Sequence, residues 1–261
     1  MKMDKTSYSI YHQIIALYTL ARKEIVRIIR IWKQTILPII ITTSLYFIIF
    51  GKLIGNRIGI VGGEEYINFI VPGLVMLSVI QNSYINVVSS FFGAKFQKSI
   101  EEMIISPMVP STIISGFVLG GVFRGVLSGV IVLCVFKILT DFTILYPISM
   151  FFLSILTAIL FSLAGFLNGM FAKKFDDISI IPTFILTPMI YLGGVFYSTD
   201  MLYGVWKKIT YFNPIFYITR SFRYCMFGID DFQIEKSIFI ILVFITILYS
   251  ICVFTLKKKD F

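Results

Sequence analysis

Long apolar stretches separated by short polar ones dominate the chain and set its predicted architecture. A helix needs about 20 mostly apolar residues to cross the hydrocarbon of a bilayer, and six stretches reach or approach that length. They are residues 34–50, 67–92, 112–138, 142–171, 178–196 and 238–256. This pattern predicts an all-α integral membrane protein with six transmembrane helices, in a six-span domain over residues 34–261.

The region before the first span has a different, two-sided pattern. Apolar residues recur at helical spacing from residue 10 to residue 32, and basic residues form the other side with Glu24 as the only acid. Helices of this kind lie in the headgroup plane of a membrane. Residues 1–33 are therefore predicted to be a cytoplasmic N-terminus with an interfacial amphipathic helix, although the same pattern fits a cytosolic helix packed on a partner.

A charged island, residues 93–110, interrupts the apolar pattern between the second and third spans. Ser99 with Glu102 three residues later has the spacing of a capping box, and Pro107 and Pro110 stop a helix. Apolar residues recur within the island at three- and four-residue steps: Phe96, Ile100, Met103 and Ile104. The island is thus predicted to be a short helix of about residues 95–106 that lies on the membrane face and docks on another protein. An ordinary loop between spans is the alternative.

The third predicted span carries two unusual features. Glycines at positions 116, 120, 121, 125 and 129 give small-xxx-small steps, which let helix backbones approach closely in lipid, and packing inside one subunit is as good an explanation as a subunit contact. Arg124 lies among them, and a charge at mid-helix costs about 2.5–3.5 kcal/mol on insertion scales. Arg124 is therefore predicted to face protein or water, as part of a translocation pathway or of a structural pair.

An aromatic segment at residues 197–232 precedes the last span. Its aromatic residues are typical of a headgroup boundary, and non-helical backbone inside a membrane is tolerated only against protein or water. Residues of about 200–230 are thus predicted to form two short re-entrant helices entering from the outer face, with an external loop as the alternative. Four of its residues are candidates for a gate: Asn213, Pro214, Arg220 and Arg223. The two arginines either bind a phosphate group or pair with Asp200, Asp230 or Asp231.

Composition supports a membrane protein, and charge indicates its orientation. Of 261 residues, 57% are hydrophobic and 14% charged, whereas soluble domains carry about 25% charged residues. Most basic residues fall on the side that holds both termini and the island, so the positive-inside rule places that side in the cytoplasm. The net charge of +9 needs no nucleic acid to explain it.

The chain has no nucleotide-binding motif. The pair Gly51–Lys52 is not a phosphate-binding loop, because Leu53 stands where a hydroxyl residue would be needed for magnesium. The chain is therefore predicted not to be an enzyme, and to bind no cofactor itself.

Three stretches resemble the membrane subunit of type-2 ABC export systems: FGAKFQKSIEEMIISPM, FAKKFDDISIIPTFILTPMIYLGGVFYS and NPIFYITRSFRYCMFGIDD. The likeness extends over nearly the whole chain. It implies a permease of the bacterial inner membrane with both termini cytoplasmic, which exports a hydrophobic or amphiphilic substrate. It also implies a homodimer that works with two copies of a separate ATPase, which binds ATP and Mg.

In this resemblance the charged island is the coupling helix that contacts the ATPase. Glu101 stands at the family's usual acidic position, and Ser99 stands where many members have threonine. The predicted contact residues are Phe96, Lys98, Ile100, Glu101, Glu102 and Ile104. The dimer is expected to be formed by the first and fifth spans and the re-entrant segment.

Two other functions fit parts of the sequence. An ion-coupled secondary transporter would need paired carboxylates or histidines inside the membrane, but the predicted spans hold only Arg124. An intramembrane prenyltransferase would use two aspartate pairs to bind magnesium diphosphate. The pairs 176–177 and 230–231 are predicted to lie on opposite sides of the membrane, which argues against that enzyme.

Overall fold

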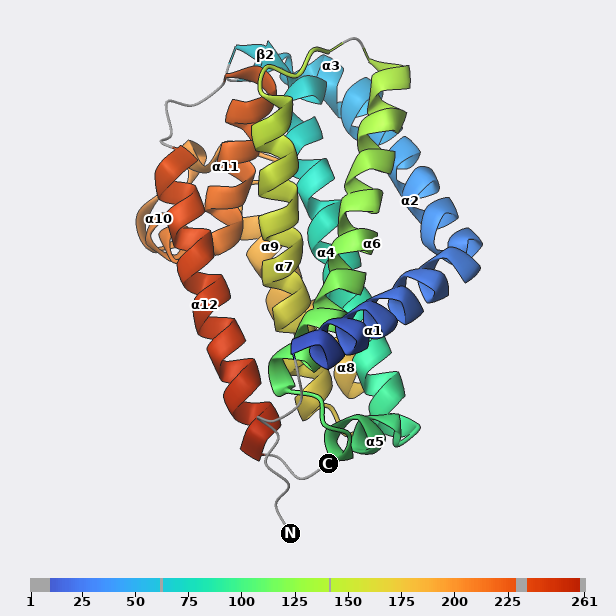
Figure 1. The fold of residues 1–261 in the computed structure, drawn as a ribbon. Coiled ribbons are helices and arrows are strands. Elements are labelled where there is room, and N and C mark those ends of the chain that lie inside the picture. The colour runs from blue at the N-terminus through green and yellow to red at the C-terminus, as the bar shows by residue number, and fades with distance from the viewer. Residues whose placement is uncertain (1–9, 62, 141, 229–233, 259–261) are drawn as a thin grey trace.

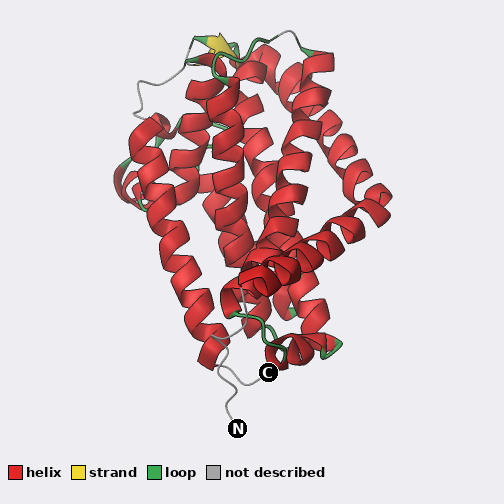
Figure 2. Cartoon of the chain, in the orientation of Figure 1, coloured by secondary structure: helices red, strands yellow, loops and turns green. Residues whose placement is uncertain are grey.

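The structure, a computed structural model, describes residues 10–61, 63–140, 142–228 and 234–258, and these residues are almost entirely helical (Figure 2). Two short strands at residues 60–61 and 64–65 pair antiparallel. In chain order the elements are α1 Ile10–Arg30, α2 Trp32–Tyr46, the π-helix Phe47–Ile54, α3 Gly55–Ile58, β1 Ile60–Val61, β2 Glu64–Glu65, α4 Tyr66–Phe96, α5 Ser99–Ile105, α6 Pro110–Leu139, α7 Pro147–Phe171, α8 Asp177–Ile181, the π-helix Pro182–Leu186, α9 Thr187–Leu192, a 3-10 turn Thr199–Met201, α10 Gly204–Tyr211, α11 Pro214–Phe227 and α12 Ile234–Lys258.

Five helices among the described residues are long and apolar enough to cross a membrane. They are Trp32–Gly51, Tyr66–Phe96, Pro110–Leu139, Pro147–Phe171 and Ile234–Lys258. They correspond to five of the six stretches predicted from the sequence. The fourth of those stretches begins later than predicted, because residues 142–146 are not helical and Pro147 occupies the first helical turn, a position that suits proline.

The predicted fifth span is shorter than expected. The apolar helix that replaces it runs from Asp177 to Leu192, which is about 24 Å at 1.5 Å per residue, whereas the hydrocarbon is about 30 Å thick. Gly193 and Gly194 end the helix, and Gly194 has a φ of +75° that favours glycine. A sixth full-length span at residues 178–196 is therefore not observed.

Helix α4 forms the centre of the molecule. It is buried along most of its length and packs against α6, α7 and α11. One close approach depends on glycine, since a Cβ on Gly73 would lie 2.5 Å from the carbonyl oxygen of Val195. Helices α2 and α12 lie at the edges of the bundle and expose most of their apolar side chains (Figure 1).

The glycines of α6 pack inside the subunit. A Cβ on Gly125 would lie 2.9 Å from Cβ of Ser83 in α4, and one on Gly120 would lie 2.6 Å from Cβ of Glu24 in α1. The intramolecular alternative for this glycine pattern is thus confirmed. Helix α1 crosses α6 obliquely at these positions (Figure 1).

The two ends of the bundle differ. Helix α5, the turn between α7 and α8 and the end of α12 lie together at one end, hereafter the α5 end (Figure 1). The strands β1 and β2 and the connection between α6 and α7 lie at the opposite end, hereafter the hairpin end.

Candidate functional site

The short helix α5 packs against the core formed by the ends of α4 and α7. Ile100 is fully buried in the apolar core, and the Ser99 hydroxyl donates a hydrogen bond to the Ala94 carbonyl oxygen at 3.1 Å. Just before α5, Lys95 Nζ donates to the carbonyl oxygens of Met170 (3.0 Å) and Ala172 (2.7 Å). These two acceptors terminate α7, so a cation satisfies carbonyls that have no partner within their own helix.

The capping box expected at this helix is not formed. Lys98, with a φ of 60°, occupies the cap position, and no side-chain capping hydrogen bond is made there. The left-handed turn at Lys98 directs the Ser99 hydroxyl back towards α4 instead of towards Glu102. The predicted helix of residues 95–106 is consequently shorter, since Lys95 and Phe96 still belong to α4.

Gln13 of α1 links the far side of α5 to the rest of the bundle. Its amide nitrogen donates to the Pro107 carbonyl oxygen at 2.8 Å. Its amide oxygen accepts from the Val109 backbone N–H at 3.1 Å and from the Thr112 hydroxyl at 2.8 Å. A single side chain therefore ties α1 to the segment that joins α5 to α6.

The predicted docking residues do not all face outward. Glu102 and Lys98 are exposed, and Glu101 and Ile104 are partly exposed. Phe96 is 67% exposed, with its ring centroid 5.0 Å from that of Phe175 in the α7–α8 turn. Ile100, in contrast, is buried in its own subunit, so its predicted contact with another protein does not fit this arrangement. Ile105, which was not predicted, is 83% exposed on the same helix.

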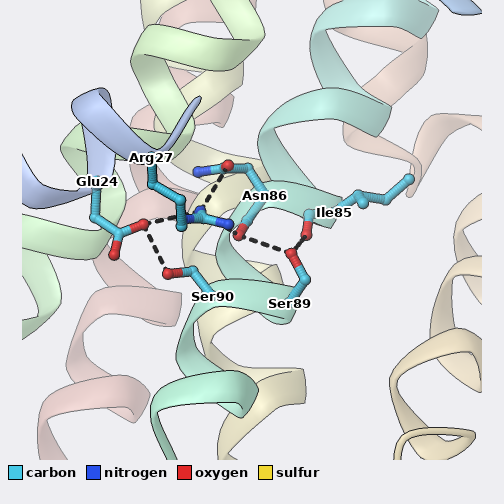
Figure 3. A network of polar contacts seen from close by, with 6 residues as sticks. All are labelled: Glu24, Arg27, Ile85, Asn86, Ser89 and Ser90. Atoms are coloured by element: carbon cyan, nitrogen blue, oxygen red, sulfur yellow. Dashed lines mark hydrogen bonds and ion pairs between the residues drawn. The ribbon is translucent and has the colours of Figure 1, made fainter. Parts of the chain in front are cut away.

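A buried polar network joins α1 to α4 near the α5 end (Figure 3). Glu24 is only 1% exposed and forms an ion pair of 2.9 Å with Arg27. Its carboxylate also accepts from the Ser90 hydroxyl at 2.7 Å, and Arg27 donates to the Asn86 side-chain oxygen at 2.9 Å. The sequence pattern grouped Glu24 with the basic residues on the polar side of α1. In the structure Glu24 is buried, because α4 supplies polar partners for it and for Arg27.

Arg124 lies in the middle of α6 and is partly buried. It lines a cavity between α2, α4 and α6, and its Nε atom is buried without a hydrogen-bond partner. The expectation that Arg124 faces protein or a cavity instead of hydrocarbon agrees with this position.

Asn213 and Pro214 form the start of α11. The Asn213 side-chain oxygen accepts from the Ile215 backbone N–H at 3.0 Å, as a helix cap does, and its amide nitrogen donates to the Met189 carbonyl oxygen at 2.6 Å. Pro214 occupies the first turn, where its missing N–H is not needed. These two residues thus fix α11 to the last turn of α9.

Arg223 of α11 stabilises the non-helical segment that follows α9. It is 2% exposed, and its guanidinium donates to the carbonyl oxygens of Gly194 (2.6 Å), Val195 (3.3 Å) and Phe69 (3.3 Å). Its Cζ lies 3.9 Å from the centroid of the Phe69 ring. A guanidinium so buried among carbonyls has a structural role.

Arg220 differs from Arg223. It is partly exposed, and its Cζ lies 5.4 Å from the Phe216 ring centroid. The suggested ion-pair partners fall outside the described part of the chain, since residues 230 and 231 and the side chain of Asp200 are not described. Contact of Arg220 with a phosphate group stays a prediction.

Sequence reasoning missed Gln13, Glu24 and Asn86. One signal for this network was present, namely the run QNSYINVVSS in the second predicted span, because polar residues inside a membrane usually have a partner. Glu24 gave another, as the single acid in a basic helix. Gln13 gave no signal, since its partners are backbone and hydroxyl groups about a hundred residues away.

Among the described residues, no group of three His, Cys, Asp or Glu side chains could hold a metal ion. Asp177 accepts from the backbone N–H groups of Lys173 (2.8 Å) and Lys174 (2.9 Å) and so stabilises its own turn. These hydrogen bonds lower the pKa of its carboxyl group below the usual range.

Long apolar helices, buried polar contacts between them and an exposed short helix at one end define a multi-pass membrane protein of the transport type. Comparison with known proteins gives the family. The ABC-2 type transporter family matches residues 15–227, and the chain belongs to this family. It is a transmembrane transport permease of the inner membrane.

Individual relatives agree with this assignment. The chain is 50% identical over 238 residues to the inner membrane transport permease YadH of Escherichia coli K12, covering 91% of this chain and 93% of the relative. It is 21% identical over 236 residues to nodulation protein J of Rhizobium leguminosarum bv. viciae, covering 87% and 90%. With nodulation protein J of Sinorhizobium fredii it shares 22% identity over 204 residues, covering 75% and 76%.

Proposed function

We propose that this chain is the membrane-spanning half of an exporter that uses ATP hydrolysed by a separate ATPase. Two copies of the chain would pair with two copies of the ATPase, and a hydrophobic or amphiphilic substrate would cross between the two permeases. The α5 end would face the cytoplasm, as the distribution of basic residues indicates. ATP and Mg would be bound by the partner, because the chain has no nucleotide-binding motif of its own.

The seating of α5 carries this proposal. A short helix that exposes Glu102 and Ile105 while Ile100 is buried presents a small, rigid surface at one end of the bundle. Lys95, in the last turn of α4, joins α4 to the end of α7. Gln13 joins the segment that follows α5 to α1. A displacement imposed on α5 would thus reach four helices, and differential contacts in two ATPase states would shift the permease between two arrangements.

The region between α9 and α12 is proposed to close the outer end of the pathway. The helix of residues 177–192 stops short of a full span, and α10 and α11 follow before the last span. These two helices support the proposal that a pair of re-entrant helices lies here, as expected from the sequence. Arg223 and Asn213 would hold them in place as a structural unit.

The proposal predicts that reversing a charge on α5 uncouples the transporter. The permease would be co-expressed with the ATPase encoded beside it, and vanadate-sensitive ATP hydrolysis and export of a fluorescent amphiphile would be measured. Like charges brought together at an interface cost several kcal/mol, so Glu101→Lys should lower coupled export about tenfold or more while insertion is unchanged.

The matched control is Glu65→Lys, the same charge reversal at the exposed hairpin end. It should leave both activities near those of the parent. Full coupled export by Glu101→Lys would show that α5 only connects two spans and does not couple to the ATPase. Export without any ATPase would favour an ion-coupled transporter.

A further inference from the structure

A half-open cavity with polar and apolar lining residues lies between α2 and the rest of the bundle, apart from α5 and from the α9–α11 region. It is bounded by α2, α4 and α6 and has a volume of about 230 Å³, several times the roughly 30 Å³ that a water molecule occupies in the liquid. Its polar lining comes from all three helices: Thr35, Thr42, Ser78, Gln81, Asn82 and Arg124. Polar groups are costly inside a membrane and usually serve a function there.

Arg124 is the single charged group of this lining, and it has no counter-ion. Its side chain forms no hydrogen bond or ion pair with the described residues, and its Nε is buried. A cation in a medium of low dielectric is stabilised by an anion that accepts its hydrogen bonds, so the cavity is electrostatically suited to an anionic group.

The neighbouring side chains suit such a group as well. Asn82 donates to the Ser78 carbonyl oxygen at 3.0 Å and Thr42 donates to the Pro38 carbonyl oxygen at 2.7 Å, which fixes both side chains against their own helices. The Gln81 amide makes no hydrogen bond to any described residue. An anion beside Arg124 would therefore find a free amide donor next to an unpaired guanidinium.

The position of the cavity indicates an amphiphile as the ligand. Arg124 lies about 21 Å along α6 from its first residue at 1.5 Å per residue, which is deep in the expected span, and its cavity opens beside α2. A molecule with an alkyl chain can enter sideways from the bilayer. Exposed apolar side chains of α2, including Leu37 (48% exposed) and Ile41 (57% exposed), provide a surface for that chain.

A basic groove on α1 adjoins this site. Arg22, Lys23, Arg27 and Arg30 line a hollow of about 530 Å³ on the outer side of α1, and Arg27 reaches from it towards α4 and Arg124. Glu24 neutralises Arg27, so the positive charge of this groove comes from Arg22, Lys23 and Arg30. Basic groups at a membrane surface attract anionic headgroups.

We propose that the cavity between α2, α4 and α6 binds the phosphate or carboxylate headgroup of a membrane amphiphile through Arg124. The site goes beyond the transport role and is a property of the permease alone. It is tested without ATP, so a failure here would leave the transport proposal standing, and a failure of coupled export would leave this site standing.

Native mass spectrometry of the delipidated permease in a neutral detergent tests the site with three probes. Dodecyl phosphate carries both chain and charge, dodecanol lacks the charge, and inorganic phosphate lacks the chain. A charge-assisted contact in a dry site should make dodecyl phosphate bind about tenfold more tightly than dodecanol, and inorganic phosphate should bind far more weakly.

Arg124→Gln should abolish the preference for dodecyl phosphate, and Arg124→Lys should keep part of it. Arg57→Gln, the same substitution at the exposed hairpin end, should bind like the parent. If Arg124→Gln does not insert, the double variant Gln81→Leu, Thr42→Val keeps the arginine and should still weaken dodecyl phosphate binding several-fold. Equal binding of dodecyl phosphate and dodecanol by the parent, inorganic phosphate binding as tight as dodecyl phosphate, or an unchanged preference in Arg124→Gln would overturn the proposal.

Discussion

At the scale of single residues, the buried charges have clearly different roles. Arg223 satisfies backbone carbonyls where the chain breaks after α9, and Glu24 neutralises Arg27 where α1 meets α4. Arg124 has neither kind of partner among the described residues. Burial alone therefore does not distinguish a structural charge from a ligand-binding one, but the hydrogen-bond partners do.

The role of Arg223 gives a prediction about stability. Arg223→Gln removes a charged donor from three carbonyl oxygens, and hydrogen bonds to charged groups contribute about 1.5–3 kcal/mol each. The unfolding midpoint should fall markedly, by an amount that corresponds to about 3 kcal/mol or more. Thermal unfolding in detergent, followed by tryptophan fluorescence, measures this change.

Arg223→Lys should lie between the parent and Arg223→Gln, because lysine keeps the charge but loses the planar fork. Arg57→Lys, at an exposed position, is the control and should unfold at the parental temperature. An unfolding midpoint of Arg223→Gln equal to that of the parent would mean that the carbonyl contacts do not stabilise the fold.

The sequence predicted the importance of some of these residues but not their partners. Arg124, Asn213 and Arg223 stand out because a charge or a helix-breaking pair interrupts an apolar pattern. The partners of Arg223 are backbone oxygens of residues 69, 194 and 195. Every residue offers such an oxygen, so no side-chain pattern marks which ones are used.

At the scale of elements, the contact between α1 and α6 depends on the absence of a side chain at Gly120. An added Cβ would lie 2.6 Å from Cβ of Glu24, closer than carbon atoms approach without a shift of the backbone. Overpacking of this kind costs about 1–3 kcal/mol. Gly120→Ala is therefore expected to lower the unfolding midpoint and to reduce coupled export.

Gly93→Ala is the matched control, because nothing lies within 4 Å of its added Cβ. Alanine is about 1 kcal/mol better than glycine inside a helix, so Gly93→Ala should be neutral or slightly stabilising. If both variants behaved alike, backbone propensity and not helix packing would govern this region.

The prediction of helices from the sequence succeeded for long apolar runs. It failed where the local backbone conformation sets the end of a helix. Five spans follow directly from runs of apolar residues. The fifth predicted stretch is apolar as well, and its helix continues through Pro182 and Pro188, but the Gly193–Gly194 pair ends it early. The capping box failed because the left-handed turn at Lys98 reoriented Ser99, and sequence spacing does not report a turn of that kind.

At the scale of the whole molecule, one side of the bundle suits a second copy of the chain. Helix α2 exposes Leu45, and the helix of residues 177–192 exposes Phe184 (73%). Tyr46 of α2 and Tyr191 of the second helix lie on the same ring, with centroids 6.2 Å and 6.0 Å from that of Phe196. The two helices therefore form a continuous apolar face, as expected for a dimer formed by the first and fifth predicted spans.

Cysteine cross-linking tests this dimer after the native cysteines are replaced. Leu45→Cys and Phe184→Cys, carried on two different copies, should cross-link in native membranes. Phe239→Cys on α12, which is comparably exposed at 67%, should not cross-link and serves as the control. Cross-links between two copies of Gly120→Cys would contradict the intramolecular packing of α6.

The overall class of the protein followed from its sequence, whereas its assembly did not. The apolar content, the charge distribution and three sequence segments that resemble the family were enough to predict a helical transport permease of the type-2 ABC family. The exposed faces of α2 and α12 are both apolar, and lipid covers such a face as well as protein does. Pattern alone therefore could not separate the dimer face from the lipid face.

The anchoring of α5 has a mechanical consequence. Lys95 joins α4 to the end of α7, and Gln13 joins α1 to the start of α6. A force applied to α5 is therefore shared among these long helices and does not bend a single one. Because these contacts are rigid, a small displacement of α5 would rotate the attached helices together. Under the proposed function, the permease would therefore change between two arrangements and would not deform gradually.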